Sequence, residues 1–158
     1  MAGTNVIASV SLVLHALSAV VWVGGMFFAL QVLRPAAGAL EAGPRLALWS
    51  RVFGRFFAWV FAAIVLLLAS GYAMVFAVFG GFSKIGLHVQ LMQGIGILMM
   101  LLFFHLYFAP WRRFRAAVRR QDWAEGGRQL AQIRAIVTIN LVLGLIVVAI
   151  GSSGRYWG

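Results

Sequence analysis

Four long apolar runs make up most of the sequence, separated by short segments rich in glycine, proline and charge. They cover roughly residues 5–33, 46–79, 85–109 and 128–150. Each exceeds the ~20 residues that a helix needs to cross the hydrocarbon of a bilayer. None shows the period-2 alternation of a membrane barrel, so helices are expected. The pattern predicts an all-α integral membrane protein, a single domain over residues 1–158 built as an up-down four-transmembrane-helix bundle.

Prolines mark where two of the predicted helices end. The first helix is expected to end at Arg34-Pro35 and the third at Pro110, because proline cannot continue helical hydrogen bonding. The segment 111–127 between the last two helices is interpreted as a basic, partly helical connection. Residues 1–4 lack the basic residues of a cleavable signal peptide, so the first helix is expected to be retained.

Composition favours lipid as the solvent of most of the chain. Hydrophobic residues make up 63% of the sequence and charged residues only 10%, whereas soluble domains are nearer half apolar. That leaves too little polar surface to solvate a globule. The chain has no cysteine, which excludes disulfides, thiolate metal sites and cysteine nucleophiles.

The net charge of +10 is concentrated around two connections. Eleven of the 13 basic residues flank the first and third connections: Arg34, Arg45, Arg51, Arg55, Arg112, Arg113, Arg115, Arg119, Arg120, Arg128 and Arg134. By the positive-inside rule, both connections are expected in the cytoplasm and both termini on the outer side. The position of these charges favours anionic lipids as partners and argues against nucleic acid.

Acidic residues are confined to the predicted cytoplasmic connections, at Glu41, Asp122 and Glu125. No carboxylate pair is expected inside the bundle, which excludes glycosidase chemistry and carboxylate proton relays. The sequence also lacks a phosphate-binding glycine loop and a serine triad. The histidines are therefore the candidate functional residues, because burying an ionisable side chain in a membrane is costly and indicates a function.

Helix depth sorts the three histidines. His15 lies ~28 Å from Arg34 and His88 ~36 Å from Arg112 at 1.5 Å per residue, so both belong to the outer half. His105 lies only seven residues from Arg112, near the cytoplasmic side. His15 and His88 are therefore the one predicted bis-histidine pair, and imidazole is a natural ligand of haem iron and a good ligand of copper.

Trp22 and Tyr72 are predicted to line this site. Trp22 shares the helix face of His15, together with the small residues Ser11, Ser18 and Gly25. Tyr72 lies at a depth similar to that of His15, where its hydroxyl could bond a ligand or relay a proton.

Other roles stay open for each of these residues. His15 and His88 also suit structural hydrogen bonds to Ser, Gln or backbone groups. His105 and Asn140 lie at similar depth, which favours an interhelical hydrogen bond between them. Met92 lies one turn after His88, and a thioether beside an imidazole suits Cu(I). The candidate metal ligands are thus His15, His88, Met92 and His105.

The run LHALSAVVWVGGMFF at Leu14–Phe28, followed by Leu33-Arg34-Pro35, resembles the first helix of the copper-resistance D (CopD) family. The resemblance, which is to the short single-domain members, continues over nearly the whole chain. Its other segments are Phe53–Phe57, Gly71-Tyr72, Leu87–Met92, Phe108–Pro110 and Gly154–Tyr156.

The resemblance implies a multi-pass protein of the bacterial inner membrane with a role in copper uptake or resistance. The family is also distantly similar to membrane protoporphyrinogen oxidases and to four-helix b-type cytochromes. In the oxidase-like relatives a His-x-Lys pattern opens the third helix, but Gln90 stands at the lysine position here, which argues against that reaction. Three histidines on two helices supply at most one bis-histidine haem.

Two functions follow as alternatives. The first is a protein with one haem b, held by His15 and His88, that transfers electrons near the outer face and leaves an oxidoreductase activity open. The second is copper uptake or resistance, with copper passed along His and Met residues. A structural subunit is a third option. Candidate partners are the lipid bilayer, an electron-transfer or copper-delivery protein on the outer side, and a second copy of the chain.

Overall fold

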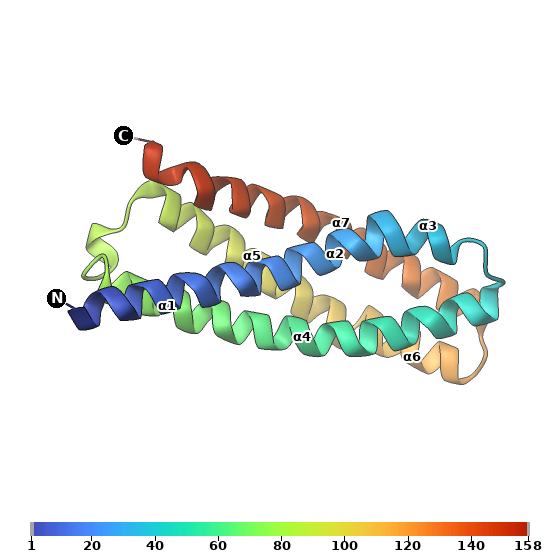
Figure 1. Cartoon of the computed structure of the whole chain (residues 1–158). Coiled ribbons are helices and arrows are strands. Elements are labelled where there is room, and N and C mark those ends of the chain that lie inside the picture. The colour runs from blue at the N-terminus through green and yellow to red at the C-terminus, as the bar shows by residue number, and fades with distance from the viewer. Residues whose placement is uncertain (1, 158) are drawn as a thin grey trace.

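The computed structural model describes residues 2–157, apart from the side chains of residues 2–4 and Arg155. Over this range the chain forms four long helical spans that run up and down (Figure 1). They are Asn5–Ala37, Ala42–Ala77, Leu87–Arg119 and Trp123–Ser153. All four are long and apolar enough to cross a membrane, and the described range contains no strand, which confirms the predicted all-α four-span fold. Residues 1 and 158 of the predicted domain lie outside the described residues.

The first span is a continuous helix with two π-helical turns. It consists of α1 (Ala2–Ala19), η1 (Val20–Gly24), α2 (Gly25–Phe28), η2 (Ala29–Leu33) and α3 (Arg34–Ala37). The sequence placed its end at Arg34-Pro35, whereas the structure continues to Ala37. Pro35 lies at the start of α3, directly after the π-helical turn η2. Single π-helical turns are frequent at functional sites.

The remaining elements are α4 (Ala42–Ala77), η3 (Phe82–Lys84), α5 (Leu87–Phe108), α6 (Pro110–Arg119), α7 (Trp123–Ser153) and η4 (Gly154–Tyr156). The basic connection is more helical than expected, because α6 begins at Pro110 and continues the direction of α5. The last helix begins at Trp123 rather than near Arg128. Asp122 caps it by accepting a hydrogen bond from the backbone N–H of Glu125 (3.0 Å).

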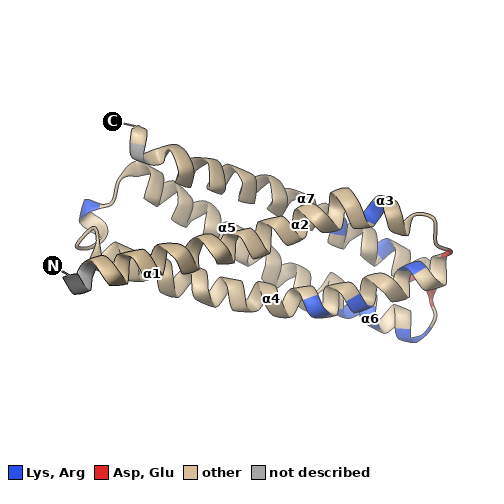
Figure 2. Cartoon of the chain, viewed as in Figure 1, with Lys and Arg blue, Asp and Glu red and all other residues tan. Residues whose placement is uncertain are grey.

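The two ends of the bundle differ in charge (Figure 2). Arginines gather at the end that holds the α3–α4 and α6–α7 connections, which we call the arginine-rich end. Both termini and the turn between α4 and α5 lie at the opposite end, which we call the terminus end. Large apolar side chains are exposed along the outside of the bundle, as with Leu12 and Trp59, and lipid is their natural solvent.

Two helical hairpins build the bundle. In the first, α1 packs along α4, and in the second, α5 and α6 pack along α7. The hairpins meet where α4 contacts α6 and α7, and where η1 and α2 contact α7. A single cluster of buried residues, drawn from all four spans, joins them.

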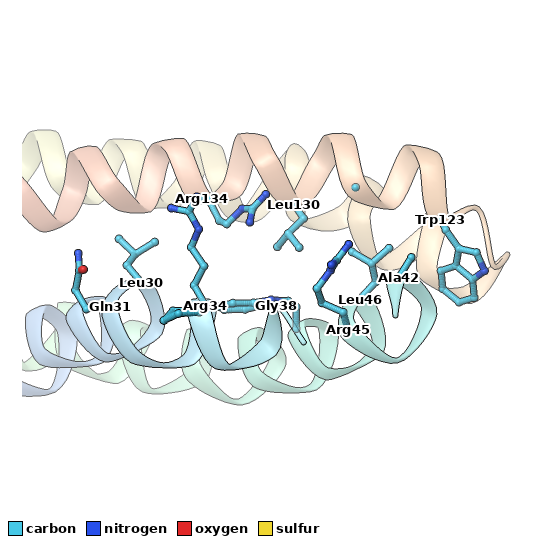
Figure 3. A pocket seen from close by; sticks show the side chains of 13 residues that line it. Leu30, Gln31, Arg34, Gly38, Ala42, Arg45, Leu46, Trp123, Leu130 and Arg134 are labelled. Carbon is cyan, nitrogen blue, oxygen red and sulfur yellow. The ribbon is translucent and has the colours of Figure 1, made fainter. Parts of the chain in front are cut away.

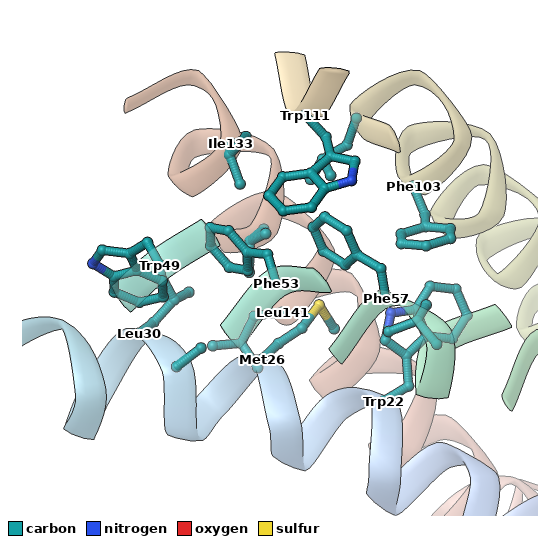
Figure 4. Packing of buried hydrophobic residues seen from close by; sticks show 14 of the residues in the cluster. Trp22, Met26, Leu30, Trp49, Phe53, Phe57, Phe103, Trp111, Ile133 and Leu141 are labelled. Atoms are coloured by element: carbon teal, nitrogen blue, oxygen red, sulfur yellow. The ribbon is translucent and has the colours of Figure 1, made fainter. Parts of the chain in front are cut away.

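Aromatic packing fills the arginine-rich half of the bundle (Figure 4). Phe53 and Phe57 of α4 stack with their ring centroids 5.2 Å apart, and Trp111 of α6 stands edge-on to Phe57 at the same distance. Trp22 and Phe103 extend the cluster toward the middle of the bundle, with ring centroids 6.2 Å apart. All five side chains are at most 3% exposed, so they form a fixed core.

Candidate functional site

His15 lies on α1 and is held by α4. Its Nδ1 is 3.0 Å from the Oγ of Ser70, a buried serine on α4. The Ser70 hydroxyl donates its own proton to the backbone carbonyl of Leu66. The Ser70 oxygen can therefore only accept from the imidazole, which places the ring proton on Nδ1. In this tautomer, the Nε2 of a neutral His15 carries the lone pair of the ring.

Gly71 gives His15 the room to lie against α4. A Cβ atom at Gly71 would stand 3.3 Å from Cε1 of His15 and 3.6 Å from its Nδ1. A larger side chain at this position would push α1 away from α4. Small residues allow close helix approach in membrane bundles generally, and here the approach supports the His15–Ser70 contact.

His88 lies at the start of α5 and packs against η4, at the C-terminal end of the second hairpin. A Cβ atom at Gly154 would overlap the Cβ, Cγ and Cδ2 atoms of His88, so only glycine leaves space for the imidazole. Trp157 stands edge-on to the ring, with centroids 6.5 Å apart. The His88 side chain is half-buried in this position.

Met92 lies one turn further along α5 and repeats the same packing. A Cβ atom at Gly151 would stand 3.0 Å from the Cε of Met92 and 3.5 Å from its Sδ. His88 and Met92 therefore share the face of α5 that packs against Gly151 and Gly154 at the end of α7 and in η4. An imidazole and a thioether are thus brought to one seam of the bundle.

Tyr72 connects the two hairpins near these residues. Its Oη accepts a hydrogen bond from Nε2 of Gln93 on α5, at 3.4 Å. Tyr72 directly follows Ser70 and Gly71, which hold His15, and Gln93 directly follows Met92. The bond therefore joins the stretch of α4 that contacts His15 to the stretch of α5 that carries Met92. The sequence identified Tyr72 by depth but did not identify Ser70 as the partner of His15.

Two other candidates are placed away from this seam. Trp22 is 3% exposed and packs on Phe103 in the aromatic cluster. His105 is exposed on the outside of α5. The predicted His105–Asn140 hydrogen bond is wrong, because the Nδ2 of Asn140 donates to the backbone carbonyl of Met99 instead (3.1 Å). His105 lies two residues past the buried Phe103, which turns it about 200° away from the core.

His15 and His88 are held by different hairpins. The described contacts of His15 are with α4. Those of His88 are with Gly154 of η4, with Trp157 directly after it and with Gly86 before α5. Within residues 2–157, no group of three or more His, Asp or Glu side chains is arranged to hold a metal ion. The pairing of the two imidazoles on one ligand stays a prediction.

The model of one protein family matches the chain. It is described as Copper resistance protein D, and the match covers residues 50–153, about two thirds of the chain. The matched range includes Ser70, Tyr72, His88 and Met92, whereas His15 precedes it. Comparison with curated proteins and with solved structures gives no match.

Proposed function

Since the chain belongs to the copper resistance protein D family, a family of membrane proteins, we propose that it binds copper as its cargo at the terminus end of the bundle. The ligands are His88 and Met92, with His15 as a further ligand to which the ion passes. One observation carries the proposal. His88 and Met92 lie one turn apart on the same face of α5. His88 packs against Gly154 of η4, and Met92 packs against Gly151 of α7.

The donor set suits Cu(I). Thioether and imidazole ligands favour this soft ion, whereas carboxylates, which favour hard ions, are absent from the described residues at this end. The packing against Gly151 and Gly154 fixes both side chains near one another at the membrane surface. Trp157 stands beside the imidazole and limits its motion.

His15 has the arrangement expected of a prepared metal ligand. Histidines that bind metals usually donate their second ring N–H to an acceptor, which fixes the tautomer and the ring orientation. Ser70 supplies that acceptor to Nδ1. The Tyr72–Gln93 hydrogen bond supports transfer between the hairpins, because it holds α4 and α5 together between His15 and Met92.

The distribution of charge gives the direction of entry. With the arginine-rich end in the cytoplasm, His88 and Met92 lie at the outer side of the membrane, which for this family we take to be the bacterial inner membrane. A copper-delivery partner on the outer side then has direct access to them. Buried aromatic side chains from three spans pack together in the arginine-rich half, so the proposed activity is binding and transfer at the outer end rather than conduction through the bundle centre.

Haem b fits the described contacts less well. Bis-histidine ligation requires two imidazoles that approach one iron from opposite sides. His15 contacts Ser70 and Gly71, whereas His88 contacts Gly86 and Gly154, and none of these contacts directs the two rings at each other. The described contacts therefore support copper rather than haem as the ligand.

Metal analysis of the purified protein, combined with its absorption spectrum, tests this proposal. After expression with ample haem and copper, we expect about one copper per chain and no Soret band. The copper content should fall in His88→Ala and persist in His105→Ala, since His105 faces away from the site. A Soret band at one haem per chain, lost in His15→Ala and His88→Ala, would overturn copper in favour of haem.

A further inference from the structure

A cavity of about 560 Å³ opens at the arginine-rich end, far from the proposed copper site. It lies between the end of the first span, the start of α4 and the first turns of α7 (Figure 3). Its lining combines cationic, aromatic and apolar side chains: Leu30, Gln31, Arg34, Pro35, Gly38, Ala42, Arg45, Leu46, Trp49, Trp123, Gly127, Leu130 and Arg134. Three separate helical segments thus contribute to one space.

Three arginines meet in this cavity without an acidic partner in its lining. Figure 3 shows the side chains of Arg34, Arg45 and Arg134 directed into the same space from opposing helices. No described lining residue is Asp or Glu. Like charges that converge in this way repel one another, so the arrangement favours an anion among them.

Three acidic residues lie near this cavity in the sequence, and none of them lines it. Glu41 is exposed and forms no ion pair among the described residues, and the other two are engaged elsewhere. Glu125 accepts hydrogen bonds from Arg128 and from Gln129 (2.7 Å), and Asp122 caps the start of α7. Guanidinium groups bind phosphate oxygens through paired, charge-assisted hydrogen bonds. The lining contains no carboxylate that could accept such bonds in place of a phosphate. No carboxylate of the lining therefore competes with an oxyanion for the three guanidinium groups.

A second cavity extends the first along the bundle. It measures about 310 Å³ and shares Leu30, Gln31 and Arg34 with the first. The rest of its lining is mostly apolar: Phe27, Thr138, Leu141, Val142 and Leu145. From Arg134 to Leu145 the groove follows α7 for about 16 Å toward the middle of the membrane. Its shape and lining suit a hydrocarbon chain.

From these two cavities we infer a site for one anionic phospholipid. The phosphodiester lies among Arg34, Arg45 and Arg134, and an acyl chain lies along the groove beside Val142 and Leu145. Basic pockets between membrane helices on the cytoplasmic side recognise anionic head groups by the same chemistry. Trp49 and Trp123 in the cavity lining suit the depth of lipid head groups. This inference does not depend on copper binding.

Lipid binding to the delipidated protein tests the head-group part. Native mass spectrometry would compare phosphatidylglycerol with phosphatidylcholine on the wild type, on Arg134→Gln and on Arg55→Gln. Arg55 is exposed at the same end but does not line the cavity, so it controls for the loss of one charge. We expect phosphatidylglycerol to bind about tenfold more weakly to Arg134→Gln, and Arg55→Gln to match the wild type. Equal retention by both variants would overturn the site.

Two further experiments distinguish binding of a lipid from binding of a free anion. Val142→Trp should fill the apolar groove, so that long-chain phosphatidylglycerol binds more weakly while a soluble glycerophosphoglycerol head group is unaffected. Inorganic phosphate alone should raise the melting temperature little, whereas phosphatidylglycerol should raise it clearly. If phosphate produces the whole effect and Val142→Trp changes nothing, the cavity binds a small anion and the lipid inference is wrong.

Discussion

The arginine-rich half and the terminus half of the bundle are built on different principles. Large aromatic side chains fill the first, and Phe53, Phe57 and Trp111 are almost fully buried there. Toward the terminus end, the described buried hydrophobic side chains are not aromatic, and they include Ala63, Ile64, Val75, Ile85 and Met99. The buried serines Ser11, Ser18 and Ser70 lie in the same half, and its histidines are half-buried. Aromatic packing is concentrated in one half, and the proposed copper ligands His15, His88 and Met92 lie in the other.

With the proposed copper site, this division separates the source of stability from the site of binding. A membrane bundle gains little from moving apolar groups out of lipid, so its stability rests on close packing and interhelical hydrogen bonds. The aromatic core supplies the packing. The terminus half holds the imidazole and thioether groups that we propose as copper ligands. Variants in the arginine-rich half should therefore change the free energy of unfolding, and variants in the terminus half should change copper affinity.

Replacing Phe57 should give the largest effect and test the role of the core. Phe57 contacts Phe53, Phe103 and Trp111, so Phe57→Ala should lower the free energy of unfolding by about 3 kcal/mol. Trp59→Ala is the matched control, because Trp59 is 65% exposed on the same helix. Denaturation followed by circular dichroism in lipid nanodiscs measures both. Equal losses in the two variants would show that the aromatic cluster is not the stable half.

Gly154→Ala should give the next largest effect and connect packing to the site. Its Cβ would overlap His88, so the chain must shift, at a cost of about 2 kcal/mol, and copper binding should weaken with it. Gly96→Ala is the control, because nothing lies within 4 Å of a Cβ there. An alanine in that helix should be neutral or slightly stabilising. Unchanged copper binding in Gly154→Ala would show that the site does not depend on the packing of His88 against Gly154.

Ser70→Ala should leave the fold intact and weaken copper binding. Loss of an outer hydrogen-bond partner lowers metal affinity by roughly tenfold or more, because the ring orientation is no longer fixed. Ser18→Ala is a close control, since Ser18 is also buried but its hydroxyl bonds only to the Leu14 carbonyl among the described contacts. Competition titration with a Cu(I) chelator measures both. If Ser18→Ala weakens binding as much as Ser70→Ala, His15 is not the residue affected.

A double-mutant cycle between His105 and Asn140 should show the smallest effect. Asn140 bonds to the Met99 carbonyl, and His105 is exposed, so their coupling energy should be about zero. Asn140→Leu alone should change stability by about 0.6 kcal/mol or less, the average for such membrane hydrogen bonds. Unfolding of the two single variants and the double variant provides the measurement. A coupling energy well above the experimental error would support the His105–Asn140 hydrogen bond that the sequence suggested.

The spans and the segregation of charge could be predicted because each depends on local composition. Continuous apolar runs select helices in lipid, and arginines in the connections gather at one end once the helices alternate in direction. The start of α7 could also have been found, since Asp122 and Glu125 have the spacing of a helix N-terminal cap. The error at His105 came from using depth without rotation about the helix axis.

The partners within the site could not be predicted, because they join distant parts of the chain. His15 and Ser70 are 55 positions apart, and many serines in the sequence could have served equally. The packing of His88 against Gly154 depends on how α5 and α7 align, which no local pattern records. The arginine-lined cavity has the same origin, since Arg34 and Arg134 meet only in the folded bundle.

Titration of Cu(I) into the protein in lipid nanodiscs tests most directly whether the terminus half is the copper site. The wild type should bind one Cu(I) per chain with high affinity. The double variant His88→Ala/Met92→Leu should lose at least about a hundredfold in affinity while its melting temperature stays near that of the wild type. A wild type that binds no Cu(I), or a double variant that binds it unchanged, would contradict the account.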